Sequence, residues 1–149
     1  MNKIKGLYAI EFEEGIKIGI SEDIRERIKV YGSPWCHTIK SVWAVESEYP
    51  RALERYLMVR YAKSIVRNST EFITGVNIVP LIKVAYGWRH IRPRDVYVIS
   101  YRKNRHFLYY TDGKDFPNLS KIDLTGTTLK SRFIKDCEKH LKWPDEKGC

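Results

Sequence analysis

The sequence is poor in cysteine and proline, and it has no long apolar run. Its three cysteines, Cys36, Cys137 and Cys149, are scattered and form no Cys-x-x-Cys pair, which argues against a disulfide framework or a zinc site. No stretch approaches the roughly 18 apolar residues of a membrane-spanning helix. The first lysines precede no apolar segment, so no signal peptide is expected. These absences favour a globular protein with free thiols in a reducing compartment, and we predict a cytoplasmic location.

Positive charge is abundant and unevenly placed. The net charge of +9 comes almost entirely from residues 51–105, which hold 12 basic and 3 acidic side chains. Residues 1–50 sum to −1 and residues 106–149 to +1. Such a local excess favours a polyanionic partner, because each neutralised phosphate releases condensed counterions. A solvated basic surface is the alternative explanation.

Apolar periodicity predicts an α+β fold with the order β-β-α-β-α-α over residues 1–92. We expect a small mixed or antiparallel three-stranded sheet flanked by helices. The predicted strands are 6–12, 16–20 and 38–45. The predicted helices run from an N-cap at Ser21 to about residue 31, from Pro50 to about 63, and from about 76 to 88.

Residues 93–149 form a second predicted segment after Arg92-Pro93-Arg94. We expect a hairpin of strands 96–101 and 107–110, and a final helix over about 129–141, packed against the first domain. The hairpin interleaves aromatic and basic side chains, which suits backbone contact and stacking on nucleic acid. An ordinary amphipathic hairpin with a charged turn is the alternative.

The first hairpin brings candidate chemical groups onto one face. A two-residue turn at Glu14-Gly15 would place Glu13 opposite Ile16, Phe12 opposite Lys17 and Ile10 opposite Gly19. Because cross-strand partners share a face and residues alternate along a strand, Tyr8 and Lys17 would then lie on the same side. Gly19 would leave bare backbone beside Tyr8, where a substrate could approach.

In these residues the chain resembles the GIY-YIG nucleases. Gly6-Leu7-Tyr8 matches the first family triplet, and Lys17-Ile18-Gly19 matches the second, with lysine in place of the usual tyrosine. This K-I-G variant is similar to a branch of the family often found in viral and mobile-element proteins. Arg27 follows Ser21 and Asp23-Ile24 at the family's spacing, and Glu71-Phe72 matches the family glutamate. The resemblance covers roughly residues 5–90.

The resemblance implies hydrolysis of a phosphodiester bond with one divalent cation, Mg²⁺ or Mn²⁺. Tyr8 and Lys17 would activate the attacking water, and Arg27 would offset charge on the phosphate. Glu71 would hold the metal. Tyr31, His37, Glu54 and Asn77 are candidate supporting residues. The predicted contacts to nucleic acid are Arg55, Arg60, Lys63, Arg67, Arg89, Arg92, Arg94, Arg102, Lys103 and Arg105.

Each site residue taken singly also has a purely structural interpretation. Tyr8 would pack across the strands, Lys17 would be a solvated strand residue, and Arg27 would pair with Asp23. Glu71 would be a loop carboxylate or pair with Arg67. The four residues together, in the family order, favour the catalytic interpretation.

Three functions therefore stay open, and an endonuclease acting on double-stranded DNA is the leading one. RNA would offer the same phosphate chemistry, and a homodimer would let a single-site enzyme cut both strands. The second is a nucleic-acid-binding module that keeps the fold without catalysis. The third is an interaction protein whose basic face meets an acidic protein.

Overall fold

The computed structural model describes residues 3–32, 39–65, 72–89 and 107–123. The strands are β1 (Gly6–Phe12), β2 (Ile16–Ser21), β3 (Ile39–Glu46), β4 (Phe72–Ile73), β5 (Phe107–Asp112) and β6 (Ser120–Asp123). The α-helices are α1 (Ile24–Ile28), α2 (Pro50–Arg60) and α3 (Ile78–Gly87), and 3-10 turns follow α1 at Lys29–Gly32 and α2 at Ala62–Ser64. Within these residues no helix is long and apolar enough to cross a bilayer.

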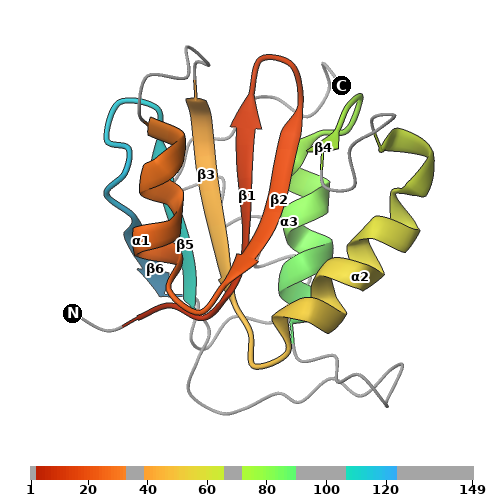
Figure 1. Cartoon of the computed structure of the whole chain (residues 1–149), viewed down its shortest axis with the longest axis horizontal. Coiled ribbons are helices and arrows are strands. Elements are labelled where there is room, and N and C mark those ends of the chain that lie inside the picture. The colour runs from red at the N-terminus through yellow and green to blue at the C-terminus, as the bar shows by residue number, and fades with distance from the viewer. Residues whose placement is uncertain (1–2, 33–38, 66–71, 90–106, 124–149) are drawn as a thin grey trace.

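The strands form one antiparallel six-stranded sheet in the order β4-β2-β1-β3-β5-β6 (Figure 1). The α+β class is confirmed, but the predicted size of three strands is wrong. The predicted strand at 107–110 exists within β5, and it extends the first sheet by pairing with β3 and β6. Residues 96–101 and the helix expected at 129–141 lie outside the described residues. Periodicity identifies a strand, but it does not say which distant strand will pair with it.

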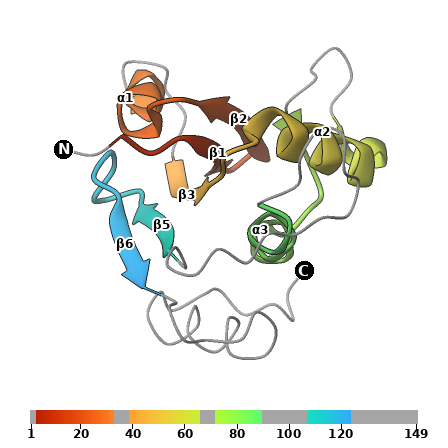
Figure 2. The same cartoon turned by 90° about the horizontal axis from the view of Figure 1, so that it is seen from below.

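The sheet is covered on both faces, which explains why β1 is almost uniformly apolar. Leu7 and Ala9 point to a core that includes Leu53 of α2 and Leu81 of α3. Tyr8 points the other way, into a second core closed by α1. Figure 2 shows α1 and α3 on opposite sides of the sheet. Alternation along one strand therefore decides which residues face α1.

The helix starts follow local capping chemistry. Asp23, and not the predicted Ser21, is the N-cap of α1, and its carboxylate accepts from the backbone N–H of Glu26 at 3.4 Å. The Ser21 hydroxyl accepts instead from the Asp23 N–H at 2.9 Å, which shapes the turn before the helix. α2 starts at Pro50 as predicted.

Candidate functional site

The β1–β2 hairpin has a different register from the predicted one. Tyr8 pairs with Gly19 and Ile10 with Lys17. The Phe12 N–H donates to the Gly15 carbonyl at 2.8 Å, which closes a two-residue turn at Glu13-Glu14, one position earlier than predicted. The register thus shifts by two residues, which restores every side chain to its predicted face. Tyr8 and Lys17 share the face that α1 covers, although the predicted partners were wrong.

The observed register puts the ring of Tyr8 directly over Gly19. A Cβ atom at position 19 would lie 2.3 Å from both the Cζ and the hydroxyl oxygen of Tyr8. Tyr8 is only 1% exposed. The bare backbone of Gly19 is therefore filled by the tyrosine ring, and the expectation that a substrate approaches there is wrong for this arrangement.

Tyr8, Tyr31 and Arg27 converge at the end of α1. The hydroxyls of Tyr8 and Tyr31 are 3.1 Å apart, and the two rings are tilted by 56° with centroids 6.0 Å apart. Arg27 lies in α1 and Tyr31 in the 3-10 turn that follows it, and both interact with Tyr8. We call Tyr8, Tyr31 and Arg27 the tyrosine–arginine cluster.

The Arg27 guanidinium belongs to this cluster. Its pKa is raised above the ordinary value, chiefly by a hydrogen bond with Tyr8 and further by its electrostatic interaction with the two phenols. The Asp23 carboxylate caps the helix instead. Arg27 is also exposed, so its guanidinium is open to a ligand arriving from solvent. An exposed guanidinium held by phenols is well suited to contact a phosphate.

The Tyr8 phenol keeps its proton in this arrangement. Burial raises its pKa most, the hydrogen bond with Tyr31 raises it further, and Arg27 opposes the shift. The net direction is upward from 10.0, so the phenol is neutral at physiological pH. A neutral phenol can donate a hydrogen bond to a water molecule, but it must lose its own proton before it can act as a base.

Lys17, the first residue of the second predicted triplet, lies on β2 two residues before Gly19, which pairs with Tyr8. Lys17 is half-buried, opposite Ile10 of β1 and opposite Phe72 of β4. Phe72, which pairs with Lys17, directly follows Glu71 in the sequence. Glu71 is the residue predicted to hold the metal. Glu71 itself lies outside the described residues. So do His37, Arg67, Arg92, Arg94, Arg102, Lys103 and Arg105.

One predicted supporting residue, Asn77, belongs to the other face of the sheet, and a second, Glu54, lies on α2. Asn77 caps α3, and its side-chain oxygen accepts from the Val79 N–H at 3.0 Å. Asn77 is therefore explained as a helix cap on the side away from the tyrosine–arginine cluster. Glu54 is half-buried on α2, whose buried residues pack on the same face as α3.

The predicted basic contacts divide into exposed and buried residues. Arg55, Arg60 and Lys63 are exposed on α2 and the turn after it. Arg89 is only 2% exposed, so its prediction as a surface contact is wrong. Its guanidinium lies 4.1 Å from the centroid of the Tyr86 ring and donates to the Tyr86 carbonyl at 2.7 Å. Arg89 lies in a segment rich in basic residues, and that sequence context alone did not indicate that its side chain is buried.

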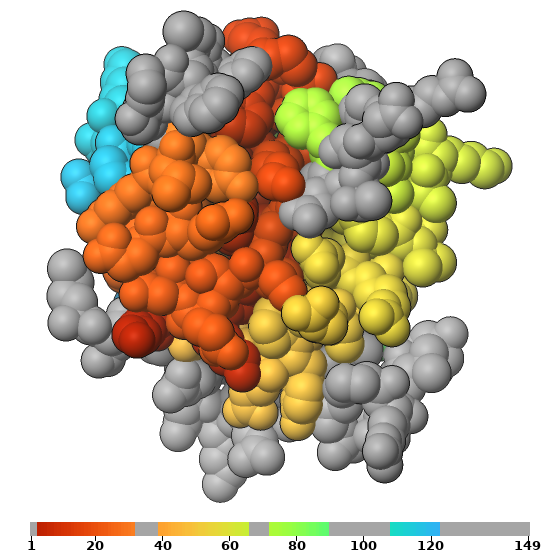
Figure 3. Space-filling view, in the orientation of Figure 1, coloured from red at the N-terminus to blue at the C-terminus, as the bar shows by residue number. Residues whose placement is uncertain are grey.

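The surface is hollowed between α1 and α2, where strand residues form the floor (Figure 3). Arg27 is exposed on α1, and Arg55 and Arg60 are exposed on α2. Comparison of the chain with family models, with curated proteins and with solved structures finds no match.

The sequence interpretation underestimated Tyr31, which it gave only a supporting role. The signal was its spacing, because a residue four positions after Arg27 must share a helix face with it. The hydrogen bond to Tyr8 could not be inferred, since it depends on how α1 packs on β1.

Proposed function

We propose that the chain is a metal-dependent endonuclease that hydrolyses phosphodiester bonds in double-stranded DNA. The observation that carries the proposal is the tyrosine–arginine cluster, formed on the same sheet face as Lys17. It supplies a phenol, an exposed guanidinium and an amine within one part of the fold. These are groups that a phosphoryl-transfer site uses to position a water and to stabilise a pentavalent phosphorus.

The cluster and Lys17 have separate parts in this reaction. Arg27 binds the phosphate oxygen that gains charge, while the hydroxyls of Tyr8 and Tyr31 hold its guanidinium in place. Lys17 holds the phosphate or, as the free amine, accepts the proton of the attacking water, and Tyr8 orients that water by donating a hydrogen bond from its hydroxyl to the water oxygen. Because the phenol stays protonated when buried, Lys17 carries more of this step than the resemblance implies.

The donor chemistry around the cluster fits a metal held by few protein ligands. Among the described residues no set of three His, Cys, Asp or Glu side chains converges. Glu71, which the resemblance implies as the metal ligand, would hold the cation together with water and substrate oxygens, since Mg²⁺ in phosphoryl-transfer sites is usually bound by one or two carboxylates. When bound, the cation stabilises charge on the leaving oxygen.

Binding of the duplex is assigned to the exposed cations on α2. Arg55 and Arg60 are exposed on α2 and Lys63 on the turn after it, and exposed cations of this kind suit contact with the phosphate backbone. Because each chain has a single site, two copies would act together on opposite strands. We place the enzyme in the cytoplasm, in keeping with its scattered thiols.

The alternative is a nucleic-acid-binding module without catalysis. The burial of Tyr8 favours it, because a phenol that is 1% exposed and keeps its proton does not meet a substrate water without rearrangement. In that case Arg27 and the α2 cations bind phosphate, and Tyr8 and Tyr31 serve only to support Arg27.

Cleavage of supercoiled plasmids of several sequences, with Mg²⁺ or Mn²⁺ and with or without chelator, separates the two functions. We expect nicking that needs the metal and falls by about 100-fold or more in Arg27→Ala, since such charge contacts supply several kcal/mol at a transition state. Glu71→Ala should lose the metal-dependent activity. Lys29→Ala, which removes an exposed cation two residues from Arg27, is the matched control and should stay active.

Equal nicking by the wild type and by Glu71→Ala on every substrate would refute catalysis. Binding of duplex DNA that is lost in Arg27→Ala would then establish the module without catalysis.

A further inference from the structure

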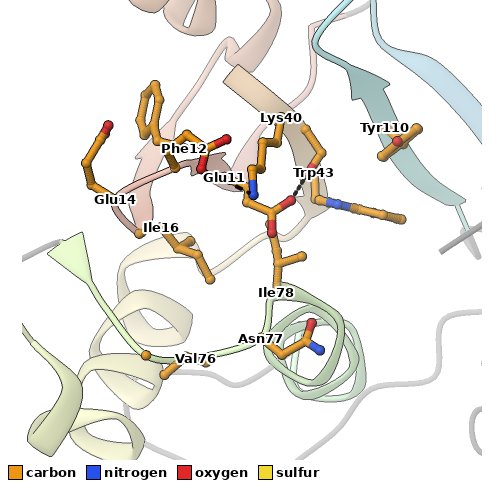
Figure 4. Close-up of a pocket in the computed structure, with 14 residues that line it drawn as sticks. Glu11, Phe12, Glu14, Ile16, Lys40, Trp43, Val76, Asn77, Ile78 and Tyr110 are labelled. Atoms are coloured by element: carbon orange, nitrogen blue, oxygen red, sulfur yellow. Dashed lines mark hydrogen bonds and ion pairs between the residues drawn. The ribbon is translucent and has the colours of Figure 1, made fainter. Parts of the chain in front are cut away.

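A cavity of about 610 Å³ lies at the turn end of the sheet, on the face opposite the tyrosine–arginine cluster (Figure 4). Its walls come from the β1–β2 turn, the start of β3, the segment that leads into α3, and Tyr110 of β5. The cavity exists because α3 begins only at Ile78, so the sheet beyond its first turn is not covered by this helix. Its volume lies within the range of small-molecule sites.

The floor of the cavity is apolar and aromatic. Its accessible apolar surface includes the half-buried Val76 and Tyr110, while Ile16, Trp43 and Ile78 lie beneath it, each at most 2% exposed. The rings of Trp43 and Tyr110 pack with centroids 4.4 Å apart and tilted by 52°. Such a floor suits an alkyl chain, and an aromatic wall also attracts a cation.

The polar groups at the cavity give it negative charge in a chain whose net charge is +9. Three carboxylates, Glu11, Glu13 and Glu14, line it together with one ammonium, Lys40. The Lys40 Nζ lies 3.7 Å from the Glu13 carboxylate. The Glu11 carboxylate accepts a hydrogen bond from the neutral hydroxyl of Ser41 at 2.9 Å. The charge of Glu11 is therefore not offset by this hydrogen bond.

Tyr110 gives a second sign of this negative potential. Burial raises its phenol pKa most, and the charges of Asp112 and Glu11 raise it further. An anion bound here would be repelled by the same charges.

We propose that this cavity binds a protonated aliphatic amine, with its alkyl chain against the half-buried Val76 and Tyr110 and its ammonium group beside Glu11. The site is independent of the proposed nuclease site, since it lies on the other face of the sheet. The alkylammonium group has two sources, a free diamine or the side chain of a lysine, and the ligands below distinguish them.

The test is a titration of the full chain at constant ionic strength, followed by the indole N–H signal of Trp43 in a ¹⁵N NMR spectrum. The ligands are 1,5-diaminopentane, Nα-acetyl-lysine methylamide and, as an uncharged match, 1-pentanol. We expect saturable shifts of Trp43 with the two amines and much weaker binding of the alcohol. Tighter binding of the diamine assigns a free amine, and tighter binding of the lysine derivative assigns a protein lysine.

Variants then test the role of charge. Glu11→Gln keeps the shape and should weaken amine binding by about tenfold, the usual effect of removing a charged hydrogen-bond partner. Lys40→Met should tighten binding, a gain that misfolding would not produce. Glu26→Gln removes an exposed carboxylate from α1 and should have no effect. The proposal is overturned if Trp43 does not respond, if pentanol binds as well as the amines, or if Glu11→Gln and Lys40→Met both leave amine affinity unchanged.

Discussion

Replacement of Gly19 by alanine tests the packing that places Tyr8. The new Cβ would lie 2.3 Å from the Cζ and hydroxyl oxygen of Tyr8 and 2.8 Å from its Cε2, whereas carbon atoms in contact are normally about 3.5–4.0 Å apart. The ring must therefore move by more than about 1 Å in an almost fully buried site, by the difference between these distances.

The expected cost has two parts. Overpacking of a buried site costs about 1–3 kcal/mol. Displacement of the ring also breaks the hydrogen bond between Tyr8 and Tyr31, which adds about 0.5–1.5 kcal/mol. We therefore expect Gly19→Ala to lower the free energy of unfolding by about 2–4 kcal/mol, as measured by urea denaturation.

Two further variants show whether the ring is the cause. Tyr8→Leu lacks every atom that the new Cβ would meet, so the cost of Gly19→Ala should fall below about 1 kcal/mol in that background. Gly87→Ala adds a Cβ to α3 with nothing within 4 Å, and it should be neutral or slightly stabilising. A penalty for Gly19→Ala that is equally large in the wild-type background and in the Tyr8→Leu background would refute the reasoning.

Two other predictions concern pH and DNA. Because the pKa of Tyr8 is raised on folding, the stability linked to this phenol is present below the unfolded pKa of about 10 and is lost as pH rises above it. Urea denaturation between neutral and strongly alkaline pH should therefore show a steeper loss of stability in the wild type than in Tyr8→Phe, and equal slopes would contradict the shift. If α2 contacts the phosphate backbone, the double variant Arg55→Ala/Lys63→Ala should reduce the slope of log K against log salt by about 2 units. Lys114→Ala, in the exposed turn between β5 and β6, should leave that slope unchanged, and a loss as large as that of the α2 variant would point to nonspecific charge.

The sequence determined features that depend on local periodicity. The β-rich runs in residues 6–12 and 16–20 were enough to predict two strands, and a two-residue turn was enough to put Tyr8 and Lys17 on one face. The prediction that Tyr8 and Lys17 share a face is correct although the predicted register was wrong by two residues. Side chains alternate every two residues along a strand, so a shift by two leaves each side chain on the same face. The spacing of Arg27 and Tyr31 likewise placed them on one side of a helix.

Only the tertiary structure decided features that depend on distant segments. β5 pairs with β3, which lies far earlier in the chain, and no local pattern names that partner. Arg89 reads as a surface cation, yet it is buried against Tyr86. The burial and raised pKa of Tyr8 arise from α1 packing over β1, and the cavity beside Glu11 arises from where α3 begins on the sheet. Sequence thus determines the direction of a side chain along its own element, whereas its exposure and charge environment depend on which elements come to lie next to it.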